Sequence, residues 1–253
     1  MIIIKSPEDI KKLNYACNIS ADVLQYAGEQ INAGMSTYEL DKLIHDFIIA
    51  HGATPSFLGL YGFKGNACIS INDEIIHGIP SKKKIIRSGD IVSVDVGAAV
   101  NGFTGDNAYT FKVGAVSPTA EKLLRVTNEC LHLGIAAAKP GNRIGDIGYA
   151  VQKHAEDNGF FVVREFVGHG VGRDMHEEPE VPNYGRAGHG VRLVPGMTIA
   201  IEPMINEGTV KIKQMPDGWT VKTADGSLSA HFEHTIAITQ NGPIILTKPS
   251  GSL

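Results

Sequence analysis

The stretch Ile91–Val113, IVSVDVGAAVNGFTGDNAYTFKV, predicts two strands joined by a tight turn at Asn101-Gly102. Asn-Gly tolerates the positive φ angles that a type I′ hairpin turn requires. This turn would place Gly97 opposite Asp106, so that Asp95 and Asp106 share one face of the hairpin. Two carboxylates in an apolar hairpin are costly to bury unless a cation lies between them. The hairpin therefore indicates a metal site; the alternative is that Asp106 belongs to a second turn and Asp95 accepts hydrogen bonds from nearby amides.

Size and composition are those of one globular domain, expected to span residues 1–253. The chain has 253 residues, of which 43% are hydrophobic and 20% charged, and its net charge is −4. This balance indicates neither DNA nor a membrane as a partner. No apolar stretch reaches membrane-spanning length, and the N-terminus lacks the pattern of a secretory signal. Three cysteines without CxxC spacing, Cys17, Cys68 and Cys130, favour reduced thiols and a cytoplasmic protein.

The chain repeats one plan in two halves, about 1–115 and about 116–253. Each half begins at a Ser-Pro helix start, the first predicting a long helix from Ser6 to about Ala33. A shorter helix follows in each half, and then a pair of strands. Three positions recur 107 residues later, with Gly34, Leu40 and Gly52 matching Gly141, Ile147 and Gly159. Two halves related by a pseudo-twofold axis are therefore expected.

The repeat also relates the acidic residues of the two halves. The displacement of 107 takes Asp95 to Glu202, and a displacement of 127 takes Asp106 to Glu233. The difference corresponds to about twenty extra residues between the strands of the second half. The four acids would meet near the pseudo-twofold axis.

Histidines complete this group of candidate metal ligands. In the segment REFVGHGVGRDMHEEP, His169 lies between two glycines, which we expect to let the backbone approach a ligand closely, and His176 follows. Four carboxylates and one imidazole suit a pair of hard-to-borderline divalent ions. A closed structural zinc site would instead need thiolates or several histidines at suitable spacing.

The ordered motifs DVGxxxxGFTGD, GHGVGRDMHEEP, MTIAIEP and HFEHT resemble those of the metal-dependent "pita-bread" peptidases, and within them the type I methionine aminopeptidases. The resemblance covers nearly the whole chain. It implies an α+β pita-bread fold, in which two αα-plus-antiparallel-hairpin halves form one curved antiparallel sheet covered by helices. The implied activity is removal of the initiator methionine from nascent proteins and peptides, through a metal-bridging hydroxide that attacks the first peptide bond.

The resemblance implies two divalent ions per chain, chosen among cobalt, manganese, iron and zinc. The implied ligands are Asp95, Asp106, His169, Glu202 and Glu233, with Asp106 and Glu233 bridging both ions. Glu202 would also carry the proton from the nucleophile to the leaving nitrogen. His176 would donate to the developing oxyanion, and His77 would contact the scissile amide or the leaving nitrogen.

The methionine side chain would need an apolar pocket. By family position its candidates are Phe57, Leu60, Phe63, Cys68, Met175 and Trp219. The chain departs from the family here, because Leu60 replaces a common tyrosine, Lys64 replaces a proline and Phe57 is bulkier than usual. These changes concern the size of the pocket and not the metal chemistry. His231 stands where glutamine is usual, which predicts altered surroundings for the bridging Glu233.

Two weaker features concern ions and partners. Asn72 and Ser229 match positions that supply oxygens to a sodium or potassium ion in relatives, although Asn72 equally suits a turn. The basic run Lys82–Lys84 with Arg87 is either a solvated loop or a transient contact with the ribosome. The expected partners are nascent polypeptide N-termini, and the expected state is a monomer.

The sequence leaves two alternative functions open. Proline-directed aminopeptidases share the metal set, but they usually carry a separate N-terminal domain for which this chain has no room. A non-catalytic pita-bread protein that binds ribosomes or peptides would typically have lost metal ligands. The full set of five ligand positions favours the methionine aminopeptidase.

Overall fold

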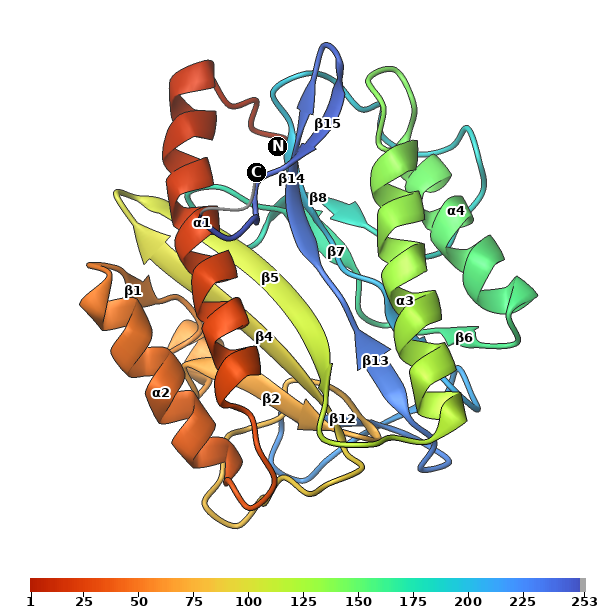
Figure 1. Ribbon diagram of the computed structural model, residues 1–253. Coiled ribbons are helices and arrows are strands. Elements are labelled where there is room, and N and C mark those ends of the chain that lie inside the picture. Colours follow the sequence, from red (N-terminus) through yellow and green to blue (C-terminus); the bar gives the residue numbers. More distant parts are fainter. Residues whose placement is uncertain (251–253) are drawn as a thin grey trace.

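The central feature of the fold is a long hairpin of two ten-residue strands, β4 (Ile91–Val100) and β5 (Phe103–Lys112). A computed structural model describes residues 1–250 (Figure 1). The predicted register is confirmed, because Val100 pairs with Phe103 and Gly97 with Asp106. Asn101 and Gly102 both have positive φ angles, 53° and 74°, as the type I′ turn requires. The alternative of a second turn at Asp106 is wrong, since this residue lies inside β5.

Two helices cover the first half of the chain. Helix α1 (Pro7–Gln30) begins at the predicted N-cap Ser6, and α2 (Thr37–Ala50) begins at Ser36. In each helix the serine hydroxyl and the carboxylate three residues later cap one another's backbone N–H groups, which stabilises the first turn. Helix α1 ends at Gln30, three residues before the predicted end. The shorter elements are β1 (Thr54–Pro55), a 3₁₀ turn at Leu60–Gly62, β2 (Ala67–Ile71) and β3 (Glu74–Ile76).

The second half repeats this arrangement with α3 (Pro118–Ala137) and α4 (Ile144–Asp157). The repeat predicted from the sequence is present in the backbone, since Gly34 and Gly141 share a φ angle near 95°. Leu40 and Ile147, the matching helix positions, are both fully buried. The strands of this half are β6 (Phe161–Val162), β7 (Gly168–Gly170), β8 (Glu177–Val181), β9 (Thr198–Ile201), β10 (Met204–Asn206), β11 (Ile212–Gln214), β12 (Val221–Thr223), β13 (Ser229–His231), β14 (His234–Thr239) and β15 (Gly242–Ile245).

The extra residues of the second half form a hairpin of their own. Strand β11 pairs with β12, and β12 also pairs with β3 from the first half. The turn of this hairpin carries Trp219, which packs edge-on against Phe63 with ring centroids 5.1 Å apart. The insertion therefore closes one side of the space between the halves.

All strand pairs are antiparallel, and they form four hydrogen-bonded groups within the curved β layer of the α+β fold. Figure 1 shows α1 and α2 over the first half and α3 and α4 over the second. The expected single return strand of the second half is interrupted at Phe232 and Glu233, which separate β13 from β14. This interruption leaves Glu233 outside the β13 and β14 ladders.

The two halves are joined directly along β5. The His231 N–H donates to Thr110 Oγ1 (2.9 Å), and the Glu233 N–H donates to the Ala108 carbonyl (2.9 Å). The Thr235 hydroxyl donates to the Asp106 carbonyl (2.8 Å). These bonds fix the positions of Asp106 and Glu233 relative to one another. No helix within residues 1–250 is long and apolar enough to cross a bilayer.

Candidate metal centre and peptide-binding cavity

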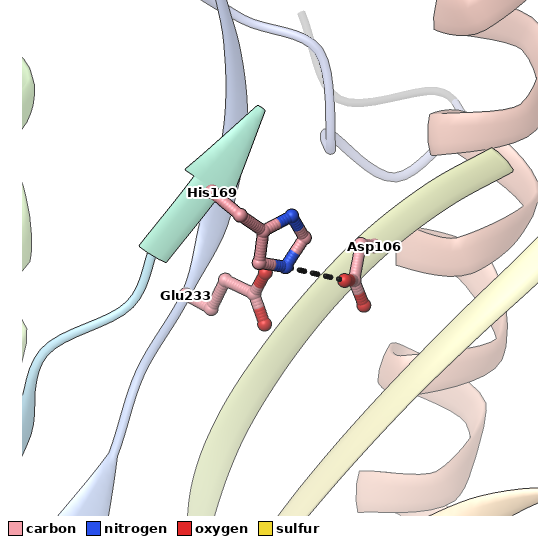
Figure 2. A group of neighbouring side chains, drawn as sticks. All are labelled: Asp106, His169 and Glu233. Carbon is pink, nitrogen blue, oxygen red and sulfur yellow. Dashed lines mark ion pairs between the residues drawn. The ribbon is translucent and has the colours of Figure 1, made fainter. Parts of the chain in front are cut away.

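Asp106, His169 and Glu233 converge between the two halves (Figure 2). Each side chain offers an atom that lies within 4.8 Å of the atoms offered by the other two. Asp106 comes from β5, His169 from β7 and Glu233 from the break between β13 and β14. Gly105 beside Asp106 lets α1 approach closely, because a Cβ there would lie 2.5 Å from the Cys17 backbone.

The other two candidate ligands flank this group. Asp95 lies on β4 and lines the same cavity as Asp106. Glu202 follows the last residue of β9, and its Oε1 lies 3.5 Å from His169 Nε2. Asp106 Oδ2 lies 3.6 Å from the same nitrogen. The structure thus brings all five predicted ligands to one place.

The glycines beside His169 allow close packing of the neighbouring strands. A Cβ at Gly168 would lie 2.3 Å from the Ala200 carbonyl oxygen, and one at Gly170 would lie 2.3 Å from the Glu178 carbonyl oxygen. That these glycines also let the backbone approach a ligand stays a prediction. They let β7 pack between β8 and β9, and this packing presents His169 to the carboxylates.

Three of the four carboxylates each have one oxygen that is available to bind a cation. Asp95 Oδ1, Asp106 Oδ1 and Glu233 Oε1 are buried, and none has a partner among the described residues. Such orphaned oxygens are costly unless a cation binds them. His169 Nδ1 lies 2.8 Å from the Gly170 carbonyl, which can only accept, so Nδ1 carries a proton and Nε2 faces the site, where it can give up its own proton to bind a cation. The donor set fits divalent ions.

The electrostatics of this group show the cost of leaving it without a cation. Burial, together with the neighbouring Asp106 and Glu202 carboxylates, raises the pKa of Asp95 well above its usual value. Burial and the same two neighbours raise the pKa of Glu233 in the same way. Burial also raises the pKa of Glu202 to about 8, against the lowering effect of His169. A bound cation would reverse these shifts by favouring the ionised carboxylates.

The histidines divide into two groups. Burial acts to lower the pKa of His169, but Asp106 and Glu202 outweigh it and raise this pKa to about 9. Burial and the neighbouring His176 lower the pKa of His77 to about 4. Partial burial and His169 lower the pKa of His176. His77 and His176 are therefore neutral at pH 7, and each can donate a hydrogen bond from one ring nitrogen and accept one at the other.

A cavity of about 520 Å³ opens beside the five candidate ligands. Five of the six predicted pocket residues line it, namely Phe57, Leu60, Phe63, Cys68 and Trp219. Met175 does not line the cavity but packs behind it against the same apolar cluster. Its position follows from Gly97, where a Cβ would lie 2.7 Å from Met175 Cε. His77 and His176 both line the cavity, as do several residues that the sequence did not predict, among them Tyr61, Ile76 and Phe166.

A buried ion pair holds the segment that carries His176. Lys5 Nζ pairs with Glu177 Oε2, and the two side chains are only 4% and 3% exposed. Glu177 Oε1 accepts from the Arg173 N–H at 2.9 Å. The N-terminal segment thereby fixes residues 171–177. The sequence offered no signal for this contact, because the partners are 172 positions apart.

His231 lies beside the candidate ligands without a partner of its own. Its Nε2 is buried with no hydrogen bond to any described residue, and it lies 3.7 Å from Glu202 Oε2. The His231 ring thus lies beside Glu202. Its expected effect on the surroundings of Glu233 stays a prediction. Burial and the neighbouring His77 lower the pKa of His231 to about 3, so its ring is neutral.

The remaining predicted residues lie outside the cavity. Asn72 has a φ angle of 56° in the turn after β2, and its carbonyl accepts from the Ser229 N–H at 2.9 Å. The two candidate cation ligands are thus neighbours. In the basic run, Lys84 Nζ pairs with Glu74 (2.7 Å) and Lys82 Nζ lies 4.8 Å from the centre of the Tyr38 ring.

Comparison with known proteins gives a consistent picture. The sequence profile of metallopeptidase family M24 matches residues 11–240. A methionine aminopeptidase of Clostridium perfringens is 51% identical over 247 residues, covering 98% of this chain and 99% of the relative. The crystal structure of a methionine aminopeptidase from Thermotoga maritima has a TM-score of 0.96 at 46% identity, covering 98% of this chain and all of that one. A prolidase from Pyrococcus horikoshii has a TM-score of 0.78 at 28% identity, and the match covers 99% of this chain and 65% of the prolidase.

Proposed function

This chain belongs to metallopeptidase family M24, and we propose that it is an aminopeptidase that removes methionine from the N-termini of nascent proteins and peptides. The observation that carries this proposal is the similarity to methionine aminopeptidases over essentially the full length of both chains. The convergence of four carboxylates and His169 beside an apolar cavity supports it independently.

Divalent metal binding follows from the family, and we propose that five side chains hold two ions. The residues that would hold them are Asp95, Asp106, His169, Glu202 and Glu233, which line the same cavity. The bound ions would supply an activated water at neutral pH and polarise the amide carbonyl. Cobalt, manganese, iron and zinc all accept this donor set.

The remaining steps are assigned to side chains of the chain itself. Glu202 would take the proton from the nucleophile and later give it to the leaving nitrogen, a role that suits a carboxylate whose pKa is easily shifted by its neighbours. His176, at the exposed edge of the cavity, would donate to the oxygen of the scissile amide as negative charge develops there. His77, which lines the same cavity and is neutral at pH 7, would contact the amide nitrogen.

The methionine side chain would lie among Phe63, Cys68 and Trp219. Phe63 and Cys68 are almost fully buried, and Trp219 covers them from the inserted hairpin. Burial and the nearby Asp95 and Asp106 raise the pKa of Cys68 well above its usual value, so this thiol stays protonated. A protonated thiol behaves as a small hydrophobe, which suits contact with a thioether.

Two alternatives are less well supported. A proline-directed peptidase is disfavoured because the prolidase from Pyrococcus horikoshii is 28% identical to this chain, whereas the methionine aminopeptidase from Clostridium perfringens is 51% identical. A non-catalytic binding protein would not need unpartnered carboxylate oxygens buried at the end of an apolar cavity.

The proposal extends to the setting in which the enzyme works. We propose a cytoplasmic monomer that meets nascent chains, with transient ribosome contact through Lys82, Lys83 and Arg87, the exposed members of the basic run. We also propose one sodium or potassium ion near Asn72 and Ser229.

The test is hydrolysis of three peptides by chelator-stripped protein to which manganese or cobalt has been returned. We expect release of methionine from Met-Ala-Ser, and no comparable release from Leu-Ala-Ser or Pro-Ala-Ser. Chelated protein should be inactive on all three peptides. Absence of methionine release with every metal, in protein shown to be folded, would overturn the proposal.

A further inference from the structure

Tyr61 stands out at the mouth of the cavity because a costly backbone conformation presents an exposed aromatic ring. Its φ angle is 50°, a left-handed value that disfavours side chains larger than that of glycine. The flanking residues Gly59 and Gly62 take the same region, with φ angles of 83° and 88°. Tyr61 is 76% exposed, so burial of apolar surface does not compensate for the strain.

The loop that carries Tyr61 is held rigidly. The Gly59 N–H donates to the Phe63 carbonyl (2.9 Å), and the Gly62 N–H donates to the Gly59 carbonyl (3.1 Å). Phe57 and Phe63, on either side of the loop, are both buried in the cavity wall. Tyr61 is therefore presented from a fixed position and not from a flexible tip.

The ring of Tyr61 extends a row of rings that starts at the metal centre. The rings of His169 and His176 have centroids 4.5 Å apart, and the ring of Tyr61 stacks on His176 with centroids 5.8 Å apart and planes 26° from parallel. Tyr61 lines the same cavity as both histidines. The row leads from His169 through His176, which is proposed to lie at the scissile amide, to Tyr61 at the open edge of the cavity.

We propose that Tyr61 binds the part of the substrate that follows the scissile bond, packing its ring against the peptide backbone of the second and third residues. This inference rests on the proposed aminopeptidase function. Methionine occupies the apolar cavity and the amide lies at His176, so the chain beyond the amide leaves past the next ring in the row. The exposed ring offers a flat apolar surface for peptide planes, and the hydroxyl makes no hydrogen bond to another described residue and can donate to a substrate carbonyl.

The test compares a substrate that can reach Tyr61 with one that ends before it. Manganese-loaded wild type, Tyr61→Gly and Tyr61→Phe are assayed on Met-Ala-Ser and on methionine amide. We expect Tyr61→Gly to lower kcat/KM for the tripeptide roughly tenfold more than kcat/KM for methionine amide, mainly by raising KM. A loss of this size corresponds to one aromatic contact. Tyr61→Phe should keep most of the preference for the tripeptide over methionine amide, because it keeps the ring.

The Tm of Tyr61→Gly distinguishes substrate binding from a purely structural role of Tyr61. Glycine relieves the left-handed strain, so Tyr61→Gly should not lower Tm while it loses tripeptide activity. Leu58→Ala serves as the matched control, because Leu58 is an exposed side chain of the same loop that does not line the cavity. Equal losses on both substrates, or a lowered Tm with equal losses, would overturn the inference. The proposed function would stand in either case if wild type releases methionine from both substrates.

Discussion

Glu202 shows most clearly how a single residue is tuned by its surroundings. It is buried, and its two carboxylate oxygens lie 3.5 Å from His169 Nε2 and 3.7 Å from His231 Nε2. Burial and Asp106 favour the protonated carboxyl, whereas His169 and a bound cation favour the ionised form. A group balanced in this way can both accept and release a proton during one reaction cycle.

Substitution of Glu202 by glutamine tests this role. We expect Glu202→Gln to lower kcat by roughly 10²- to 10⁴-fold, because an amide cannot carry the proton. Metal binding, measured by calorimetry with manganese, should weaken but persist through the other four ligands. Glu165→Gln is the matched control, since Glu165 is an exposed carboxylate beside the cavity-lining Phe166. Activity of Glu202→Gln close to that of wild type would contradict the assignment.

Individual residues also show which parts of the site could not be predicted from the sequence. The five candidate ligands could be found because the repeat and the hairpin register place carboxylates at matching strand positions. Tyr61 gave no such signal, because its importance lies in a left-handed φ angle and a ring contact with His176. Met175 was misplaced for a similar reason, since its position behind the cavity depends on the absence of a side chain at Gly97.

At the scale of elements, segment 171–177 is the piece whose position matters most for His176. It is tied to β5, where the Thr104 N–H donates to the Gly172 carbonyl (2.8 Å). It is tied to the N-terminus by the Lys5–Glu177 pair, and Lys5 is itself held by its N–H, which donates to the Gly196 carbonyl (2.8 Å). Removing the lysine would leave the Glu177 carboxylate buried without its cation.

We therefore expect Lys5→Met to destabilise the protein by about 3–5 kcal/mol, the usual cost of breaking a buried ion pair from one side. Urea unfolding measures the free energy, and steady-state kinetics should show a lowered kcat because His176 loses its fixed position. The double variant Lys5→Met with Glu177→Gln removes both charges and should recover much of the stability. A Lys5→Met protein as stable as wild type would show that the pair does not hold this segment.

Local sequence signals specified most elements. The N-cap at Ser6, the Ser-Pro start of the second half at Ser117 and the Asn101-Gly102 turn are short-range features, and each lies where it was predicted. The interruption between β13 and β14 was not foreseen, because it depends on how Glu233 meets β5 across the interface of the two halves. Contacts between segments that are far apart along the chain produce no periodic pattern of residues in the sequence.

At the scale of the whole molecule, the candidate metal centre lies at the interface between the two halves. Asp95 and Asp106 come from the first half, whereas His169, Glu202 and Glu233 come from the second. We propose that residues 1–253 act as a single domain, because separating the halves would dismantle both the site and the bonds along β5.

Stability of the metal-free protein should consequently depend on pH. The raised pKa values of Asp95, Glu202 and Glu233 mean that the folded protein holds protons that the unfolded chain releases. Their contribution to stability is present at low pH and is lost as pH rises toward about 8, the pKa of Glu202. His169, with its pKa of about 9, acts in the same direction. Histidines with lowered pKa values oppose this trend only below about pH 6.5, where the unfolded chain protonates them.

Between pH 6.5 and 8 the metal-free protein should therefore become less stable by about 1.4 kcal/mol per pH unit for each extra proton held by the folded state. Urea unfolding in the presence of a chelator, at several pH values, measures this slope. With manganese bound the carboxylates are ionised in the folded protein, and their part of the slope should disappear. A metal-free protein whose stability is flat or rises across this range would contradict the proposed electrostatics.

The most direct test of the metal centre follows occupancy and catalysis in the same samples. Chelator-stripped protein is titrated with cobalt while its visible absorption and its hydrolysis of Met-Ala-Ser are recorded together. We predict that both signals rise with added metal and that Asp106→Asn, which alters the central ligand, loses both. Methionine release at the full rate from metal-free protein, or from Asp106→Asn without the absorption, would show that these side chains do not form the catalytic metal site.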